Sequence, residues 1–324
     1  MVFHQFPLDK AFLVATWLES LVFGLYLCIF CLSIYVNFTA IGTRSMHNRI
    51  MFAASMIMFL FASLHLAMNC YRMVRGYVDF GMAPGGPVGY IGNLATWHHI
   101  FKDTLYATQS ILGDTVAVYR CWVLWDQDYR FILFPSVLLM GSAVSGYMVC
   151  GLYSTVNPLA TVFDPRLTRW ITTFYSIAVA QNILTTGLMA LRLWQGERES
   201  ARYRMGGGIF MPVIRILVES AALYLFVEIL LLSLYSVNYN AQYILLEIVT
   251  PIVGITFSTI TLRISLRSQN RSLKSNGGTM TGGATQTIGS MPMRPIAVNI
   301  TTIREDDGSP IEDVEANSLK CETN

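Results

Sequence analysis

The sequence contains little charge for its length. Of its 324 residues, 13% are Asp, Glu, Lys or Arg and 53% are hydrophobic, with a mean hydropathy of +0.48. A soluble domain of ordinary composition has about 25% charged residues. The net charge is +2, and the basic residues are scattered between apolar segments, so no basic face supports nucleic-acid binding. This composition predicts a membrane protein with the lipid bilayer as its main partner.

Residues that would anchor a cofactor are scarce in the apolar stretches. The four lysines (Lys10, Lys102, Lys274 and Lys320) are placed at or beyond the ends of these stretches, which argues against a retinal Schiff base. His65 is the only histidine inside a stretch, so haem ligation by two histidines has no pair. The sequence contains no P-loop, GxSxG elbow or HExxH motif. We therefore expect no cofactor, no metal and no enzymatic activity.

Seven long apolar stretches fill residues 1–264. Each is long enough for a spanning helix, which needs about 20 mostly apolar residues. The predicted spans are Phe12–Val36, Met51–Tyr71, His99–Trp125, Phe131–Tyr153, Trp170–Leu193, Pro212–Tyr235 and Gln242–Ile264. The connection 74–97 is rich in Gly and Pro, which predicts an irregular segment over the mouth of the bundle. The fold class is therefore all-α, a polytopic seven-transmembrane helix bundle.

The composition changes abruptly after Ile264. Gly, Ser, Thr and charged residues replace the aliphatic ones over residues 265–324. Such a segment buries too little apolar surface to offset the entropy of ordering it, so we expect a disordered cytosolic tail. Two interpretations stay open, a regulatory tail that is phosphorylated and a solvated tail without a specific partner.

Basic residues are unevenly distributed between the two sets of connections. The richer set contains Arg44, Arg49, Arg120, Arg130, Arg192, Arg198, Arg202, Arg204, Arg263, Arg267, Arg271 and Lys274, and the poorer set contains Lys10, Arg72, Arg75, Lys102, Arg166 and Arg169. Since Lys and Arg favour cytosolic loops, we expect a multi-pass plasma-membrane protein with its amino terminus outside and its carboxyl terminus in the cytosol. Cys70 and Cys150 then face the outside, either bridged or as two free thiols.

The third stretch carries a polar stripe. At about 100° per residue, four polar side chains project within about 60° of one another: His99, Asp103, Ser110 and Asp114. A carboxylate at the bilayer centre costs about 2.5–3.5 kcal/mol, so the stripe should face the bundle interior. Asp114 either forms the floor of a ligand or ion path, beside the small Ala107, or hydrogen-bonds neighbouring helices. His99 and Asp103, near the outer surface, are expected to be solvated.

Acidic residues also interrupt the first, sixth and seventh stretches. Glu247 shares one face with Thr250, Gly254, Ser258 and Thr261, and Pro251 predicts a kink beside it. Glu228 lies near the membrane midplane without a partner in its own helix, which makes it a second candidate for a cavity. Glu219 follows Arg215 by four residues and is expected to form an ion pair. Glu19 is expected to reach the headgroup region.

His65 supports one alternative with a metal. It could approach His98 or His99 together with Asp103, giving nitrogen and oxygen ligands of the kind that zinc accepts. Against this, adjacent histidines point in different directions, and the later stretches contain no second histidine cluster. A membrane metal-dependent hydrolase is therefore the third hypothesis for the function.

The end of the third stretch carries the most distinctive motif. Tyr119-Arg120-Cys121-Trp122 is followed by Trp125, and aromatic residues and arginine are typical of a membrane interface. The motif resembles that of the seven-helix integral membrane proteins expanded in mushroom-forming basidiomycete fungi. The resemblance covers all seven stretches and implies a layout similar to G-protein-coupled receptors, but it implies no ligand or activity for particular residues. The position of Arg120 at the end of the third stretch separately suggests the receptor arrangement in which such an arginine governs coupling to a cytosolic protein.

We expect a receptor-like protein that senses a small molecule from outside. Asp114, Glu228, Glu247 and Ser110 are the candidates for a shared ligand cavity, and Arg120 is the candidate for coupling. The loop 192–204 and the tail would contact a cytosolic signalling partner. The main alternative is a secondary transporter or proton-coupled carrier, in which the same carboxylates would titrate during transport.

Overall fold

The structure is a computed structural model that describes residues 6–39, 46–155, 162, 164–201 and 211–276. The backbone alone is described at some helix ends. Several predictions lie outside the described residues: those on Arg44, Arg202, Arg204 and the tail beyond residue 276, and those on the side chains of Arg215, Arg267, Arg271 and Lys274. The described residues all lie in one compact unit.

All regular structure in the described residues is helical. The elements are α1 (Leu8–Thr39), α2 (Met46–Val74), η1 (Arg75–Asp79), α3 (Gly86–Ile91), α4 (Trp97–Leu124), η2 (Tyr129–Phe131), α5 (Leu133–Tyr153), α6 (Pro165–Ala201), α7 (Met211–Ser236) and α8 (Gln242–Asn276). Each predicted span overlaps one long helix. The all-α prediction is therefore confirmed.

Six helices in the described part of the chain are long and apolar enough to cross a membrane: α1, α2 together with η1, α5, α6, α7 and α8. The chain is therefore a multi-pass membrane protein. The predicted third span corresponds to α4, which is not among these six. This helix is 28 residues long but contains Lys102, Asp103 and Asp114, whose charges lower its hydropathy.

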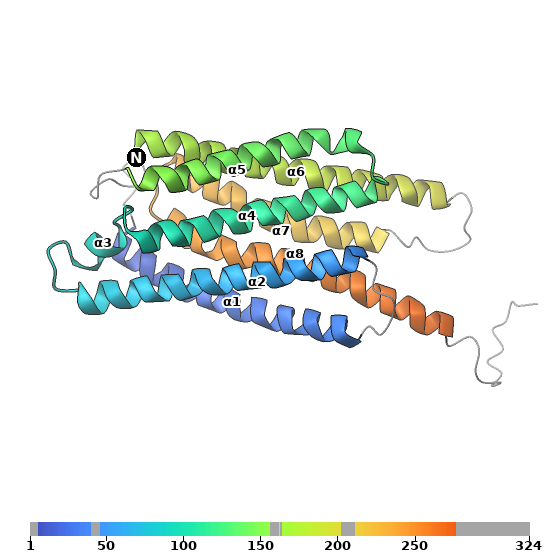
Figure 1. Cartoon of the computed structure of the whole chain (residues 1–324), viewed down its shortest axis with the longest axis horizontal. Coiled ribbons are helices and arrows are strands. Elements are labelled where there is room, and N and C mark those ends of the chain that lie inside the picture. Colours follow the sequence, from blue (N-terminus) through green and yellow to red (C-terminus); the bar gives the residue numbers. More distant parts are fainter. Residues whose placement is uncertain (1–5, 40–45, 156–161, 163, 202–210, 277–324) are drawn as a thin grey trace, which may run out of the picture. The chain divides into compact units, whose positions relative to one another are not determined.

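The long helices run side by side along the longest axis of the unit (Figure 1). We call the end at which α1 begins the amino-terminal end. Helices α4, α6 and α8 also begin there, whereas α2, α5 and α7 end there, so consecutive long helices alternate in direction. The other end is called the opposite end.

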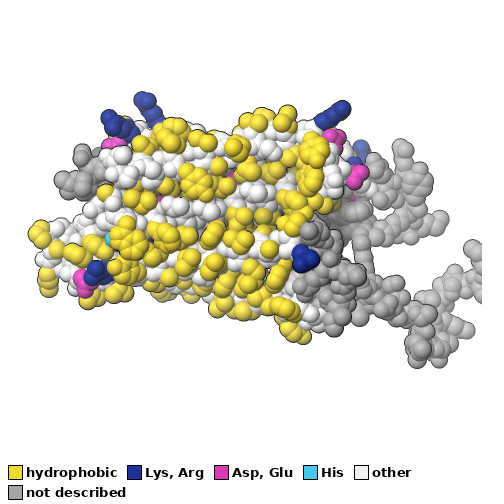
Figure 2. Space-filling view, in the orientation of Figure 1, with side chains coloured by type: hydrophobic (Ala, Val, Ile, Leu, Met, Phe, Trp, Pro, Cys, Tyr) yellow, Lys and Arg dark blue, Asp and Glu magenta, His cyan; other side chains and the backbone are white. Residues whose placement is uncertain are grey.

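The outer surface of the bundle is apolar. Large hydrophobic side chains cover the visible face, whereas Lys, Arg, Asp and Glu gather toward its two ends (Figure 2). Trp17, Leu25 and Phe38 on α1 are each more than 60% exposed. Exposing such a surface to water is unfavourable, whereas contact with the hydrocarbon core of a bilayer is not.

Small residues permit close packing between α1 and α8. A side chain at Gly254 of α8 would collide with the ring of Tyr26, which is fully buried on α1. Close backbone approach at glycine is a general device of helix packing in membranes. The face of α8 that the sequence indicates as polar is buried: Glu247, Thr250 and Ser258 are at most 3% exposed.

One prediction about a chain segment is wrong in part. The connection 74–97 is not irregular throughout, because it contains η1 and the short helix α3, which has Pro87 in its first turn, where a missing N–H is tolerated. Helix α8 continues past the predicted seventh span to Asn276, with Pro251 inside it, while the part apolar enough to cross a membrane is Gln242–Arg263.

Candidate functional site

The polar stripe of α4 faces the interior of the bundle. His99, Asp103, Ala107, Ser110 and Asp114 are each at most 8% exposed. The inward orientation of the stripe is therefore confirmed, but the expectation that His99 and Asp103 are solvated is wrong. The reason lies in the connection between α2 and α4, which folds over this end of the bundle, with Ile91 and Leu94 each 3% exposed.

Charged side chains from four helices meet in the half of the bundle nearer the amino-terminal end. Glu19 (α1), His65 and Asn69 (α2), Lys102 (α4) and Glu247 (α8) are each at most 5% exposed. We call these five residues the Glu247 network. Their burial overturns one expectation, because Glu19 does not reach the headgroup region. Lys102 lies near the start of α4, as predicted, but its side chain is buried in the bundle.

The Glu247 network is joined by direct contacts. His65 Nδ1 lies 2.7 Å from Glu19 Oε1, and Asn69 Nδ2 donates to Glu19 Oε2 at 2.6 Å. Lys102 Nζ donates to Glu247 Oε1, and His65 Nε2 lies 3.6 Å from Glu247 Oε2. Because buried charges are tolerated only when they are paired, these contacts explain how ionisable residues fit within an apolar bundle.

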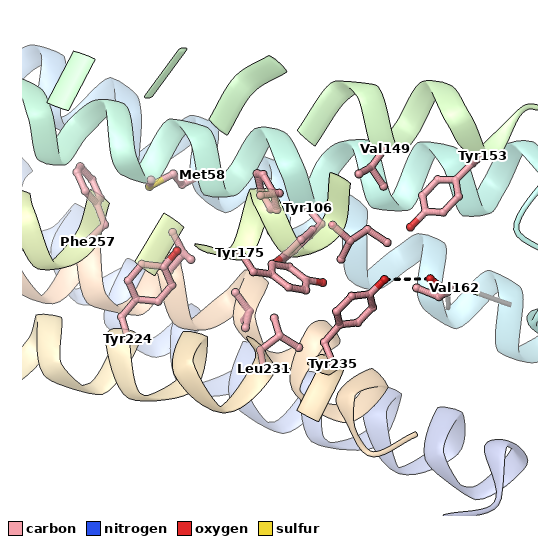
Figure 3. Packing of buried hydrophobic residues seen from close by; sticks show 14 of the residues in the cluster. Met58, Tyr106, Val149, Tyr153, Val162, Tyr175, Tyr224, Leu231, Tyr235 and Phe257 are labelled. Atoms are coloured by element: carbon pink, nitrogen blue, oxygen red, sulfur yellow. Dashed lines mark hydrogen bonds between the residues drawn. The ribbon is translucent and has the colours of Figure 1, made fainter. Parts of the chain in front are cut away.

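A cavity adjoins the Glu247 network. We call it the aromatic cavity because aromatic side chains form much of its wall: Phe12, Tyr106, Tyr153, Phe174, Tyr175 and Tyr243. Tyr106, Tyr153 and Tyr175 are seen in Figure 3. The space open to the centre of a water-sized sphere is about 50 Å³. Since one water needs about 10–15 Å³ by this measure, the cavity has room for a few waters or a small ligand.

Several polar atoms on the wall of the aromatic cavity lack a hydrogen-bond partner, although Arg72, Asp103 and Glu247 each form a hydrogen bond through another atom. Buried atoms that make no hydrogen bond among the described residues include Arg72 Nε, both ring nitrogens of His99, Asp103 Oδ1, Gln242 Nε2 and Glu247 Oε2. Leaving such an atom unsatisfied costs about 1–3 kcal/mol. The cavity is therefore suited to an occupant with both donors and acceptors. Arg72 and Lys102 balance Asp103 and Glu247 in charge, which favours a neutral occupant.

A second group of polar residues lies deeper in the bundle, among α4, α6 and α7. We call Ser110, Asp114, Asn182, Tyr224 and Glu228 the Asp114 cluster. Asn182 Nδ2 donates to Glu228 Oε2 at 3.3 Å, and the Tyr224 hydroxyl interacts with both Ser110 and Glu228. Asp114 interacts electrostatically with Glu228, while its Oδ2 atom makes no hydrogen bond within the described residues. The groups that donate hydrogen bonds to Glu228 are thus neutral side chains.

The structure divides the four residues proposed for a shared ligand cavity. Ser110, Asp114 and Glu228 belong to the Asp114 cluster, whereas Glu247 belongs to the Glu247 network. Asp114 lines a separate cavity with about 70 Å³ open to the centre of a water-sized sphere, between α4, α6, α7 and α8. The hypothesis of one cavity beside all four residues therefore becomes two sites along the bundle.

Arg120 points into the bundle rather than toward its surface. Its Nη2 atom donates to Thr261 Oγ1 at 2.7 Å and to the Phe257 carbonyl at 3.4 Å, and its guanidinium lies 4.5 Å from the centre of the Phe257 ring. Arg120 also lines the cavity beside Asp114. It therefore links α4 to α8 near the opposite end of the bundle.

Other candidates from the sequence lie elsewhere. His65 does not join His98, whose ring packs against Tyr90 at 5.2 Å. Glu219 is exposed, and its expected partner Arg215 lies outside the described side chains. Cys70 and Cys150 are two free thiols rather than a bridge.

Comparisons with protein-family models, curated proteins and solved structures found no match to this chain. The function is therefore inferred from the chemistry of the buried sites.

Proposed function

We propose that the chain is a seven-helix, receptor-like membrane protein that binds a small molecule in the aromatic cavity. The observation that carries this proposal is the set of buried, unsatisfied polar atoms on the cavity wall. A cavity that only filled space would be lined by apolar groups and would stay dry. The motif from Tyr119 to Trp125 and its resemblance to the basidiomycete seven-helix proteins support the same layout.

In this proposal α4 also crosses the membrane, which raises the number of crossings from six to seven. At 1.5 Å per residue its 28 residues extend about 42 Å, enough for a hydrocarbon core of about 30 Å. Its charged residues are turned inward, so the cost of placing them in lipid does not arise. The amino terminus is assigned to the outside, on the distribution of Lys and Arg.

The proposed ligand is a small neutral molecule with an apolar body and a hydroxyl or amide group. Aromatic rings would contact the apolar body, and Arg72, Asp103 and Gln242 offer both donors and acceptors. Pockets for small molecules commonly combine an apolar wall with a few directed polar groups.

Signal transfer would run along α4. The same helix places Lys102 and Asp103 at the cavity, Asp114 in the deeper cluster and Arg120 against α8. A shift of α4 on ligand binding would change the contacts of Arg120 with Thr261 and Phe257. The predicted loop 192–204 is helical as far as Ala201, because α6 continues to that residue. The end of α6 from Arg192 onward would then contact a cytosolic signalling protein.

A thermal-stability screen tests the proposed site. Purified protein in nanodiscs is heated with a panel of small hydroxyl- and amide-bearing aromatic and aliphatic compounds. A compound at about 100 times its Kd stabilises the folded state by about 2.7 kcal/mol, which raises Tm by several degrees. Ala107, which is 3% exposed, lines the cavity, so Ala107→Leu should fill the space and abolish the shift.

The matched control is Ala53→Leu, because Ala53 is exposed on α2. It should keep the ligand-dependent rise in Tm. The proposal fails if no compound of this class raises Tm, or if the hits stabilise the Ala107→Leu variant as much as the parent protein.

A carrier is the second candidate, favoured by the two carboxylates of the Asp114 cluster. Buried carboxylates near the middle of a membrane bundle are typical of proton relays. A carrier should accumulate a compound identified in the screen inside proteoliposomes under a pH gradient, and Asp114→Asn should abolish that accumulation. A receptor should show no such uptake, and its ligand should instead change nucleotide exchange on a reconstituted heterotrimeric G protein.

A further inference from the structure

His65 lies between two carboxylates. Its Nδ1 atom is 2.7 Å from Glu19 Oε1, and its Nε2 atom faces Glu247 Oε2 at 3.6 Å. An ionised carboxylate only accepts hydrogen bonds, and a neutral imidazole has one N–H. If Nδ1–H donates to Glu19, the lone pair of Nε2 faces another acceptor. The gap between Nε2 and Glu247 Oε2 is then suited to a positively charged species, which both acceptors would attract.

We propose that a divalent transition-metal ion of the zinc type binds in this gap. His65 Nε2 and Glu247 Oε2 would be its direct protein ligands. Two ligand atoms at Zn–N and Zn–O distances of about 2.0–2.2 Å in a tetrahedral site lie about 3.4 Å apart. The observed 3.6 Å is too long for a hydrogen bond but close to this separation.

The residues behind His65 resemble the usual support of a metal-binding histidine. Such a histidine generally donates its other N–H to a carboxylate, which fixes the tautomer and the ring orientation. Glu19 occupies this position, and Asn69 in turn donates to the second oxygen of Glu19. Glu19, His65 and Glu247 each offer one ligand atom within 4.8 Å of the other two.

Lys102 is the nearest competing cation. It contacts Glu247 through Oε1, whereas Glu247 Oε2 is buried and makes no hydrogen bond in the described part of the chain. Lys102 Nζ also lies 3.5 Å from Asp103 Oδ1, so a second carboxylate is available to it. Oε2 is therefore the ligand atom that Lys102 leaves free.

The aromatic cavity would supply the remaining coordination positions. Glu247 lines this cavity, which has room for a few waters. A zinc ion with few protein ligands and bound water leaves positions open to an incoming molecule. The site does not depend on the proposed receptor function, because the metal binds without any organic ligand.

Metal binding to the full chain tests the inference. Protein purified in detergent is stripped with EDTA and titrated with Zn²⁺ for stoichiometry by mass spectrometry, and with Co²⁺ for the visible absorption bands of a nitrogen- and oxygen-ligated site. We expect one ion per chain. His65→Ala and Glu247→Gln should abolish binding, and Glu19→Gln should weaken it by about 10- to 100-fold, the effect typical of an outer partner.

His98→Ala is the matched control, because His98 is buried on α4 at the same end but is outside the three-residue group. It should retain the ion. Elution volume and circular dichroism identify any variant that fails to fold, and the rise in Tm that Zn²⁺ produces in the parent protein provides a readout without any variant. The inference is overturned if the parent protein binds no ion, which would leave a proton in the gap. It is equally overturned if His98→Ala loses the ion as His65→Ala does.

Discussion

The Glu247 network and the Asp114 cluster are both acidic and buried, but their carboxylates have different partners. Glu247 is paired with Lys102 and faces His65. Asp114 and Glu228 form no ion pair among the described side chains, and the hydrogen bonds to Glu228 come from two neutral groups, the amide of Asn182 and the hydroxyl of Tyr224. Burial alone therefore does not define a functional carboxylate in this bundle.

This difference determines how each site should respond to mutation. Removing one member of a buried ion pair leaves an uncompensated charge, which is far more costly than the net contribution of the pair. Removing the charge of a carboxylate that has only neutral partners relieves a desolvation cost instead. The Glu247 network should therefore be sensitive to loss of one charge, whereas the Asp114 cluster should tolerate it.

The largest loss of unfolding free energy is expected from Lys102→Met. The substitution keeps an apolar stem but leaves Glu247 without its cation, so it should lower the free energy of unfolding by about 3–5 kcal/mol. Denaturant titration of the protein in mixed micelles measures this change. The double variant Lys102→Met/Glu247→Gln should recover most of the loss.

Lys10→Met is the matched control, because Lys10 is exposed on α1. Its effect should stay within about 0.5 kcal/mol. A loss of less than about 1 kcal/mol in Lys102→Met would contradict the assignment of a stabilising ion pair to the Glu247 network.

A smaller loss of unfolding free energy than that of Lys102→Met is expected from Arg120→Met. The variant loses the hydrogen bond to Thr261 and the contact with the Phe257 ring. Hydrogen bonds from charged groups contribute about 1.5–3 kcal/mol, so we expect a loss of about 1–3 kcal/mol in the same titration. Arg130→Met is the control at an exposed arginine of η2. Equal effects in the two variants would show that the contacts of Arg120 add no stability.

The sequence is sufficient to predict the positions of the long helices and the inward stripe of α4. Both depend on local periodicity, since a charged face of a membrane helix has to turn away from lipid. For the same reason the polar face of α8 could be predicted without knowledge of its neighbours.

The pairing of Lys102 with Glu247 could not be predicted from one helix at a time. These residues lie 145 positions apart in the chain, and their contact depends on which helices are neighbours. One signal was nevertheless present, because α4 and α8 begin at the same end and each residue lies five positions after its helix start. At 1.5 Å per residue both are about 7.5 Å along their helices. A comparison of how far Lys102 and Glu247 lie from the starts of their helices would have suggested this ion pair.

The prediction that Glu19 reaches the headgroup region was wrong for a related reason. Its distance from the end of the first stretch suggested contact with the headgroups, but the neighbouring α2 presents His65 and Asn69 to it. A carboxylate with two buried donors is more stable inside the bundle than its depth alone indicates. The buried donors on α2 therefore determine where the Glu19 side chain lies.

Among these substitutions, Glu228→Gln is expected to change the free energy of unfolding least. The substitution also compares the two sites most directly. The amide keeps an oxygen that can accept from Asn182 and removes a charge that has no cationic partner among the described residues. Its unfolding free energy should stay within about 1 kcal/mol of the parent value or rise. Glu247→Gln makes the same chemical change but leaves Lys102 without its ion pair, so it should be clearly destabilising. If Glu228→Gln proves as costly as Glu247→Gln, a cation must pair with Glu228 in the membrane, and Arg120, which lines the cavity beside Asp114, would be the first residue to test.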